Sequence, residues 1–325
     1  MKISIITVCK NSEQTIEKTI QSVLSQSILS ESSLFQTDIE IEYIIVDGLS
    51  TDRTLEIIQK YTSQIHKVIS ETDSGIYQAM NKGIQAATGE WLYFLNSDDY
   101  LFDNTVIQDV VQCLVHNPEY DFVYGNHEAR FPFGKSSIHQ PAPPEQAPEE
   151  FVSLGNCFIQ PESFFKATLF QKLGLFSEAY RIAADYEWFM RLFSDPTVKI
   201  THFPRVIVSY AHGGASSQIR PLFEETFAIQ NQVPLYQQTD WIQKRLLKLQ
   251  QSFIDKYDLL ERTHHLSQKR EQRIRYLESR EDQLQAQVDA LQAELTALKT
   301  SKVWYVRSLW FKLKQAIRGN TDKHQ

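Results

Sequence analysis

The stretch WLYFLNSDDYL, residues 91–101, decides the fold of this chain, because a buried strand ends there in two adjacent carboxylates. Five mostly apolar residues come first, and Asn96, Ser97, Asp98 and Asp99 follow directly. Adjacent carboxylates repel and raise each other's pKa unless a cation lies between them. The pattern predicts a strand that carries acidic groups to one edge of a sheet.

On either side of this stretch, apolar runs alternate with helical patterns over the first 125 residues. Strands are expected at 3–9, 41–47, 67–70, 91–96 and 121–125, and helices near 12–26, 52–63, 75–88 and 103–116. Such alternation is typical of an α/β fold with a mostly parallel sheet covered by helices on both faces. Ligands bind such sheets at the carboxyl ends of the strands.

Three of the expected strand ends carry acids. Asp47 ends the second strand, Glu71 and Asp73 follow the third, and Asp98 and Asp99 follow the fourth. Each alone could be a turn or helix-capping residue. Together they indicate a site for Mg²⁺ or Mn²⁺, which takes one or two carboxylates and the phosphate oxygens of a substrate.

The remainder of the first 235 residues is assigned to the same domain. Five prolines in 131–150 predict a long loop or linker there. Helices are expected around 162–173 and 183–195, and a strand near 198–210.

The last ninety residues differ in kind, since residues 236–298 read as a helical region and 299–325 as a basic amphipathic tail. An apolar 3-4 spacing interrupted only by Glu281 predicts a coiled coil at about 274–298, through which the chain could form a homo-oligomer; its members are Ile274, Leu277, Leu284, Val288, Leu291, Leu295 and Leu298. The tail mixes Lys302, Arg307, Lys312, Lys314 and Arg318 with Val303, Trp304, Trp310, Phe311 and Leu313. That mixture favours an anionic membrane surface over nucleic acid; the alternative is a helix that packs on its own protein.

The charge distribution and the cysteine content indicate the partners and the cellular compartment of the protein. Residues 1–240 hold 16 Lys and Arg against 30 Asp and Glu, whereas residues 241–325 hold 17 against 10. Acidic body and basic tail should therefore have different partners. Cys9, Cys113 and Cys157 are scattered, and no apolar run is long enough to span a bilayer, so we expect a cytoplasmic protein. Its basic amphipathic tail would dock it on the inner membrane face.

Three segments in order resemble a known family: TVCKNSEQTIEKTIQSVLSQ, then IIVDGLSTDRT, then SETDSGIYQAMNKGIQAATGEWLYFLNSDD. They are similar to the nucleotide-binding half of family 2 inverting glycosyltransferases with the GT-A fold, of the kind that builds bacterial surface glycans. The resemblance extends through RIAADYEWFMRL and HGGASS to about residue 220. It implies a nucleotide-diphosphate sugar donor and a glycan or lipid-linked acceptor.

The resemblance also implies roles for residues of the donor site. Asp47 would bond the nucleotide base beside Thr7 and Val8, and Asp73 and Lys82 would line the nucleoside pocket. Asn96, Ser97 and Asp98 occupy the place of the family's DxD motif, with Asn96 where an Asp is frequent. Asp98 would be the main metal ligand, with Asp99 nearby or sharing that role.

The implied catalytic base is Asp185, in AADYEWFMRL. A carboxylate there would remove the proton from the acceptor hydroxyl as it attacks the anomeric carbon, and one displacement gives inversion. Glu187 is the competing candidate. Gln160 and Glu162 are possible acceptor-site groups, and His212 is a possible phosphate or metal contact.

Two other functions stay open at this point. A nucleotidyltransferase would also use a metal and acidic strand ends, although the first turn, VCKNSEQT, lacks a basic triphosphate-binding loop. A degenerate transferase domain could act only as a scaffold through its coiled coil. A receiver domain is excluded, because it needs an acidic pair where Cys9, Lys10 and Asn11 stand.

Overall fold

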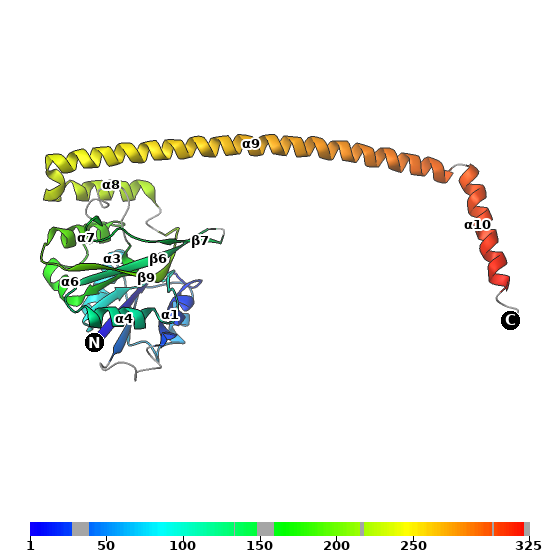
Figure 1. Ribbon diagram of the computed structural model, residues 1–325. Helices are drawn as coiled ribbons and strands as arrows, with labels where there is room; N and C mark the ends of the chain where they lie inside the picture. The colour runs from blue at the N-terminus through cyan, green and yellow to red at the C-terminus, as the bar shows by residue number, and fades with distance from the viewer. Residues whose placement is uncertain (28–38, 133, 148–158, 215–217, 301, 322–325) are drawn as a thin grey trace. The chain divides into compact units, whose positions relative to one another are not determined.

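The structure is a computed structural model that describes residues 1–27, 39–132, 134–147, 159–214, 218–300 and 302–321. The chain forms two compact units, Met1–Gln251 and Ser252–Gln325. The first unit contains the expected α/β sheet (Figure 1). The expected domain boundary at residue 235 stays a prediction.

Four parallel strands form one half of the sheet, in the order β3–β2–β1–β4. They are β1 (Lys2–Cys9), β2 (Glu40–Asp47), β3 (Lys67–Ser70) and β4 (Trp91–Phe94). Strands β1 and β2 are buried on both faces, which explains their nearly continuous apolar sequences. Because the four strands run in the same direction, their carboxyl ends meet at one edge.

The other half of the sheet is mixed, because antiparallel strands join the expected parallel ones there. Strand β8 (Ser163–Lys166) lies antiparallel between β4 and β6 (Phe122–Phe131). Strand β9 (Ile200–Ala211) runs parallel to β6 and antiparallel to the short β5 (Tyr100–Leu101). The described pairings are therefore four parallel and four antiparallel, counting β6 with β7 (Lys135–His139).

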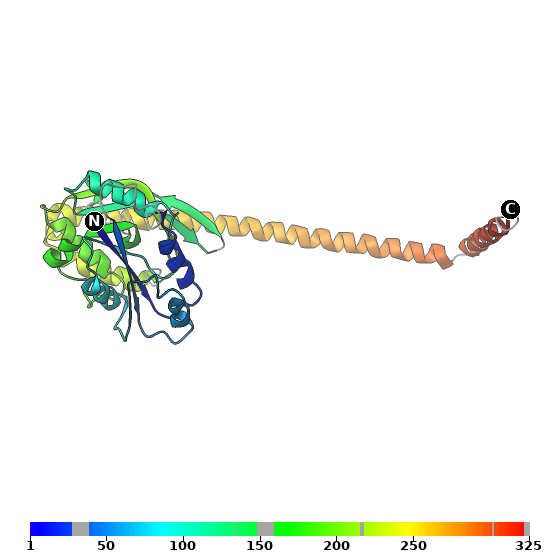
Figure 2. The ribbon, with the colours of Figure 1, turned by 90° about the horizontal axis from the view of Figure 1, so that it is seen from below.

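Helices cover both faces of the sheet over two separate hydrophobic cores (Figures 1 and 2). One core packs against α1 (Ile16–Leu24), α2 (Thr54–Gln59) and α4 (Val106–His116). The other packs against α3 (Ile76–Ala86), α6 (Ala167–Leu173) and α7 (Ala184–Ser194). Alternation along β1 divides its side chains, with Ile3 and Ile5 in the first core and Ile6 and Val8 in the second.

Two local expectations about the second half of the domain need correction. Strand β6 continues to Phe131, and β7 pairs with it inside the segment that was expected to be a loop. All side chains of β7 are exposed, so the strand has no apolar alternation to reveal it. The expected helix at 162–173 instead begins with the 3₁₀ turn η2 (Gln160–Glu162) and strand β8, and only Ala167–Leu173 is helical.

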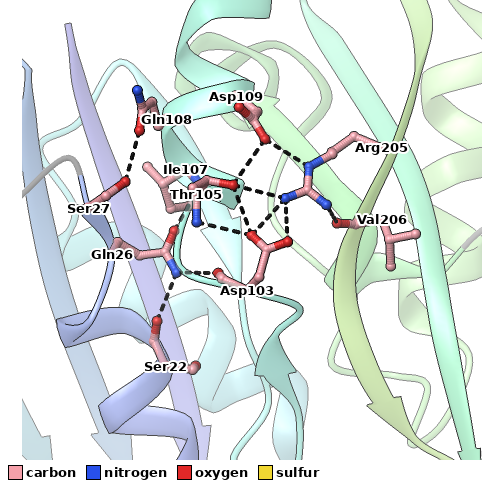
Figure 3. Close-up of polar contacts among 10 residues, drawn as sticks. All are labelled: Ser22, Gln26, Ser27, Asp103, Thr105, Ile107, Gln108, Asp109, Arg205 and Val206. Atoms are coloured by element: carbon pink, nitrogen blue, oxygen red, sulfur yellow. Dashed lines mark hydrogen bonds and ion pairs between the residues drawn. The ribbon is translucent and has the colours of Figure 1, made fainter. Parts of the chain in front are cut away.

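A polar network secures the segment that follows β5 (Figure 3). The Arg205 guanidinium on β9 donates to Asp103 at 2.6 Å and to Asp109 at 2.8 Å. Gln26 Nε2 donates to the Asp103 carbonyl at 2.7 Å, and Gln26 Oε1 accepts from the Ile107 amide. These bonds tie α1, α4 and β9 together just downstream of the Asp98–Asp99 pair.

The chain then becomes helical, with α8 (Ile219–Gln230), the 3₁₀ turn η4 (Pro234–Gln237) and α9 (Thr239–Thr300). The apolar side chains expected to form the coiled coil lie on α9 and are exposed. The tail forms α10 (Lys302–Thr321). Among the described residues, no helix is both long enough and apolar enough to cross a membrane.

Candidate active site

A cleft of about 920 Å³ opens at the carboxyl ends of the parallel strands. Its walls come from the ends of β1 and β4, the start of α3, turn η2, the residues before α7 and the end of β9. Six of the residues expected in the site line it, namely Val8, Asp73, Asn96, Ser97, Asp98 and Asp185. Thr7, Asp47, Lys82 and Asp99 were expected there too, but they lie outside the lining.

The two adjacent aspartates after β4 occupy different environments. Asp98 is half-buried and lines the cleft, and burial is the main cause that raises the pKa of its carboxyl. Asp99 is fully buried, where its Oδ1 accepts from the Ala211 amide at 2.7 Å and its Oδ2 from Asn96 Nδ2 at 3.2 Å. Burial and the nearby Asp98 charge raise the Asp99 pKa strongly. Asp99 therefore joins the turn to β9.

Arg130 on β6 supports the same turn from behind. Its guanidinium donates to the Asp98 carbonyl oxygen at 2.5 Å and lies 4.4 Å from the centre of the Tyr100 ring. Lys18 Nζ also lies over the Tyr100 ring, at 3.5 Å. Two cations thus lie close to the acidic turn without filling the cleft.

Asn96, which lines the same cleft as Asp98, offers an oxygen atom suitable for a hard cation. The buried Asn96 Oδ1 has no hydrogen-bond partner among the described residues, although a buried polar oxygen normally has one. The described residues hold no cluster of three or more His, Cys, Asp or Glu side chains that could bind a metal alone. One carboxylate and one amide oxygen fit a Mg²⁺ or Mn²⁺ ion that completes its shell with water and substrate phosphates.

Asp185 enters the cleft from the first turn of α7. Its Oδ1 accepts from Tyr77 OH at 2.9 Å and from the Tyr186 amide at 2.8 Å. Burial is the main cause that raises the pKa of the Asp185 carboxyl, and the hydrogen bond from Tyr77 opposes that rise. Both of these hydrogen bonds use Oδ1.

The competing carboxylate, Glu187, is engaged elsewhere. Its Oε2 pairs with Arg191 at 2.8 Å, one turn further along α7, and it does not line the cleft. The geometry favours Asp185 as the acidic group of α7 that can reach a substrate.

The residues expected to hold the nucleoside lie partly beneath the cleft. Asp47 is fully buried and accepts from Ser50 Oγ at 2.5 Å and from Ser70 Oγ at 2.8 Å. Thr7 is also buried and contacts Tyr43 OH at 3.2 Å. Both side chains therefore form the support under the cleft floor.

The loop after β3 brings Asp73 to the cleft. Lys82 Nζ donates to the Thr72 carbonyl at 2.6 Å and pairs with Glu71 at 3.0 Å, so it fixes this loop from α3. A Cβ on Gly48 would lie 2.2 Å from Asp73 Oδ2, and only glycine leaves room for Asp73 in this position.

Of the two possible acceptor-site residues, one lines the cleft and the other is buried. Gln160 lines the cleft, whereas Glu162 is fully buried and lies 2.6 Å from His127 Nδ1. Burial lowers the His127 pKa to about 4 and raises that of Glu162. The His212 ring lies 5.1 Å from the Phe131 ring, centre to centre, and His212 does not line the cleft. Residues 215–217 of HGGASS, and Cys157, lie outside the described residues.

Several cleft residues were missed by sequence reasoning. The loops after β1 and β2 interlock, since the Thr51 amide donates to Asn11 Oδ1 at 2.8 Å and the Glu13 amide to Asp52 Oδ2 at 3.1 Å. Their polar sequences, KNSE and LSTD, were the available signal. Arg181 and Tyr210 also line the cleft, and no sequence pattern marked them.

Comparison with known proteins identifies the family of this chain. The profile described as "Glycosyl transferase family 2" matches residues 4–178, just over half of the chain. A "PGL/p-HBAD biosynthesis glycosyltransferase" of Mycobacterium bovis is 30% identical over 191 residues, which are 57% of this chain and 71% of that protein. A glycosyltransferase of Haemophilus influenzae is 31% identical over 173 residues, 52% of this chain and 58% of that protein.

Solved structures show the same fold. TarS 1–349 of S. aureus in complex with UDP-GlcNAc has a TM-score of 0.55 at 20% identity, covering 72% of this chain and 68% of that one. The complex of TarS 1–349 with UDP has a TM-score of 0.51 at 24% identity, covering 70% of this chain and 65% of that one. The expected GT-A type fold is thereby confirmed, and the chain belongs to glycosyl transferase family 2.

Proposed function

We propose that this chain transfers a sugar, with inversion, from a nucleotide-diphosphate sugar to a hydroxyl of a glycan or lipid-linked acceptor. The observation that carries the proposal is the meeting of Asp98 and Asp185 in one cleft at the carboxyl ends of the sheet. Asp98 shares the cleft with Asn96, whose amide oxygen has no partner among the described residues, and Asp185 lies at a helix N-terminus with a raised pKa. These two environments suit two different tasks.

The donor occupies the half of the cleft formed by the ends of β1, β2, β3 and β4. Val8, Asp73 and Ser97 contact the nucleoside directly in this proposal, while Thr7, Asp47 and Lys82 support that wall from beneath. Ser97 Oγ lies 2.8 Å from Ser12 Oγ, which joins the loops after β1 and β4 across the floor. The pocket wall is therefore tied together before a donor binds.

Asp98 and the Asn96 amide oxygen would hold the divalent ion. When bound, Mg²⁺ or Mn²⁺ acts as a Lewis acid that offsets the charge on the leaving diphosphate. Asp99 assists by locking the turn through the Ala211 amide, and its second oxygen could still join the ligand set. Asn96 in place of an aspartate lowers the negative charge of the site by one.

Asp185 is the base. Its carboxylate accepts the proton of the attacking hydroxyl, and the raised pKa favours proton uptake at neutral pH. Tyr77 orients the carboxylate through Oδ1. No covalent enzyme intermediate is needed, because a single displacement moves the sugar and inverts the anomeric carbon.

Turnover of a nucleotide-sugar panel with Mn²⁺, Mg²⁺ or EDTA tests this function. The panel contains UDP-GlcNAc and further UDP-, GDP- and dTDP-sugars, and nucleoside diphosphate release is the readout. We expect turnover of at least one donor that EDTA abolishes and that Asp98→Ala lowers about 100-fold or more. Glu119→Ala, an exposed carboxylate distant in sequence, is the control and should behave as wild type.

The outcomes separate the alternatives. Release of pyrophosphate from nucleoside triphosphates would identify a nucleotidyltransferase. Metal-independent turnover, or full activity of Asp98→Ala, would refute the proposed metal role.

The C-terminal helices extend the proposal beyond the reaction. The exposed stripe at 274–298 of α9 associates with the same stripe of a second or third copy, and α10 docks on an anionic membrane surface. Val303, Val306, Trp310 and Leu313 follow 3-4 spacing on α10 and are exposed, and Lys302, Arg307 and Lys314 lie close by. A docked tail would bring the cleft to acceptors held in a membrane.

A further inference from the structure

One side chain of α8 holds the three residues that precede α7. Glu225 Oε1 accepts from the Arg181 amide at 2.9 Å, and Glu225 Oε2 accepts from the amides of Ile182 and Ala183, each at 2.9 Å. Three consecutive backbone N–H groups thus converge on one carboxylate. The N-cap residue of α7, Ala183, makes no side-chain capping hydrogen bond in the described structure.

The same residues are held from the opposite direction by α3. Tyr77 OH lies 2.5 Å from the Ile182 carbonyl oxygen and 2.9 Å from Asp185 Oδ1. Asp185 follows Ala183 by two residues, so the anchored backbone leads directly into the first turn that carries it. The backbone before Asp185 is therefore hydrogen-bonded to both α3 and α8.

We propose that Glu225 is a positioning residue that fixes the backbone of 181–183 and thereby holds Asp185 in the cleft. The inference rests on the proposed role of Asp185 as base. It reaches beyond the family match, which ends at residue 178, and it gives α8 a part in the reaction.

The physical chemistry supports so large a role for one carboxylate. Ala183 is the N-cap residue of α7, so its amide lacks an intrahelical partner, and an anion there also interacts favourably with the helix dipole. Hydrogen bonds to an ionised acceptor are about twice as strong as those between neutral groups. Without Glu225 three amides would lose their acceptor, and a shift of about 1 Å at a reacting group can lower a rate about 100-fold.

Helix α8 is itself firmly attached, which allows it to act as an anchor. Gln230 Nε2 donates to Tyr186 OH at 2.8 Å, and the buried Arg245 of α9 donates to Gln230 Oε1 at 3.1 Å. Arg245 also donates to Asn231 at 2.9 Å. Glu225 therefore projects from a helix that contacts both α7 and the start of α9.

The test compares Glu225→Ala and Glu225→Gln in the full chain with Glu224→Ala, the exposed neighbour on the same helix. Hydrogen exchange reports the amides of residues 181–183, and turnover is measured with the same UDP-, GDP- and dTDP-sugar panel. We expect Glu225→Ala to expose those amides and to lower kcat about 10- to 100-fold, with the KM for the donor within about twofold. Glu225→Gln retains one acceptor oxygen and should therefore keep part of the amide protection and part of the wild-type kcat.

Wild-type kcat together with protected amides in Glu225→Ala would overturn the inference. A loss of donor affinity as large as the loss of kcat would also overturn it, because Glu225 would then support the stability of the whole site rather than the position of Asp185. If Glu225→Ala unfolds, the same comparison is made with Glu225→Gln. Asp185→Asn separates the two claims. If Asp185→Asn is inactive while Glu225→Ala matches Glu224→Ala, only the role of Glu225 fails, whereas an active Asp185→Asn contradicts the proposed base itself.

Discussion

At the scale of single residues, the acidic groups of the cleft differ through their neighbours. Asp98 faces the cleft, Asp99 bonds the Ala211 amide inside the protein, and Asp185 bonds Tyr77. Burial raises the pKa of all three carboxyls, but only two of them can meet a substrate. Adjacent sequence positions therefore lie in different environments.

Tyr77→Phe should shift the pH dependence of the reaction. Asp185 acts as a base only when ionised, so activity falls as the pH drops below its pKa. The hydrogen bond from Tyr77 favours the ionised carboxylate, whereas burial and Glu225 disfavour it. Removing the hydroxyl should raise the Asp185 pKa, and the acidic limb of the kcat profile should move up by about one pH unit.

The pH profile of kcat between about pH 5 and 9 measures this shift. The phenylalanine ring keeps the packing of Tyr77 on Phe176, where the ring centres are 5.8 Å apart. Tyr180→Phe, whose hydroxyl contacts Gln232 instead, is the matched control. An unmoved or lowered acidic limb in Tyr77→Phe would show that Tyr77 does not control the base.

At the scale of elements, apolar strands could be predicted and polar ones could not. Strands β1, β2, β3 and β4 and helix α7 were expected within a few residues of their observed bounds, because burial imposes regular patterns on their sequences. Strand β7 escaped because its side chains are all exposed. The insertion of β8 between β4 and β6 joins segments about seventy residues apart, and such pairing leaves no local signal.

The site was predictable to a similar degree. Strand ends placed Asp98 near the ligand edge, and the family resemblance pointed to Asp185. Whether a side chain faces the cleft or the interior depends on partners from distant elements, such as Ala211 for Asp99 and Ser70 for Asp47. Glu225 offered no sequence signal at all.

The exposed apolar stripe at 274–298 of α9 predicts that copies of the chain associate. Seven apolar side chains of 274–298 are exposed, and their burial on association would contribute about 1.5 to 3 kcal/mol per leucine. Sedimentation should give a multiple of 37.8 kDa for the wild type and a lower mass for the double variant Leu284→Lys, Leu291→Lys. The control is Ala286→Lys, Ala293→Lys, which adds the same charge on the side of α9 opposite the stripe and should sediment as wild type. A wild-type chain that sediments at 37.8 kDa would contradict association.

At the scale of the whole molecule, charge separates along the chain. Residues 1–240 carry an excess of 14 acidic groups and residues 241–325 an excess of 7 basic ones. The α10 segment Lys302–Thr321 contains no acidic residue. An acidic body would be repelled by an anionic surface, so any attraction must come from the tail.

Deletion of residues 299–325 should abolish binding to vesicles of anionic phosphatidylglycerol. Each basic side chain near such a surface contributes about 1 kcal/mol, and the apolar stripe of α10 adds burial. Co-sedimentation of the full chain with anionic vesicles, but not with neutral phosphatidylcholine, measures the effect. Equal sedimentation of the full and shortened chains would refute the membrane anchor, and unchanged donor turnover would show that the deletion left the first unit intact.

The central claim is that Asp185 is the base of a glycosyl transfer, and Asp185→Asn tests it most directly. Asparagine keeps the size and an oxygen for Tyr77 but cannot take up the proton. With the donor that the wild type turns over, nucleoside diphosphate release should fall about 100-fold or more, while donor affinity measured by calorimetry changes by less than about twofold. Full turnover by Asp185→Asn would contradict the account.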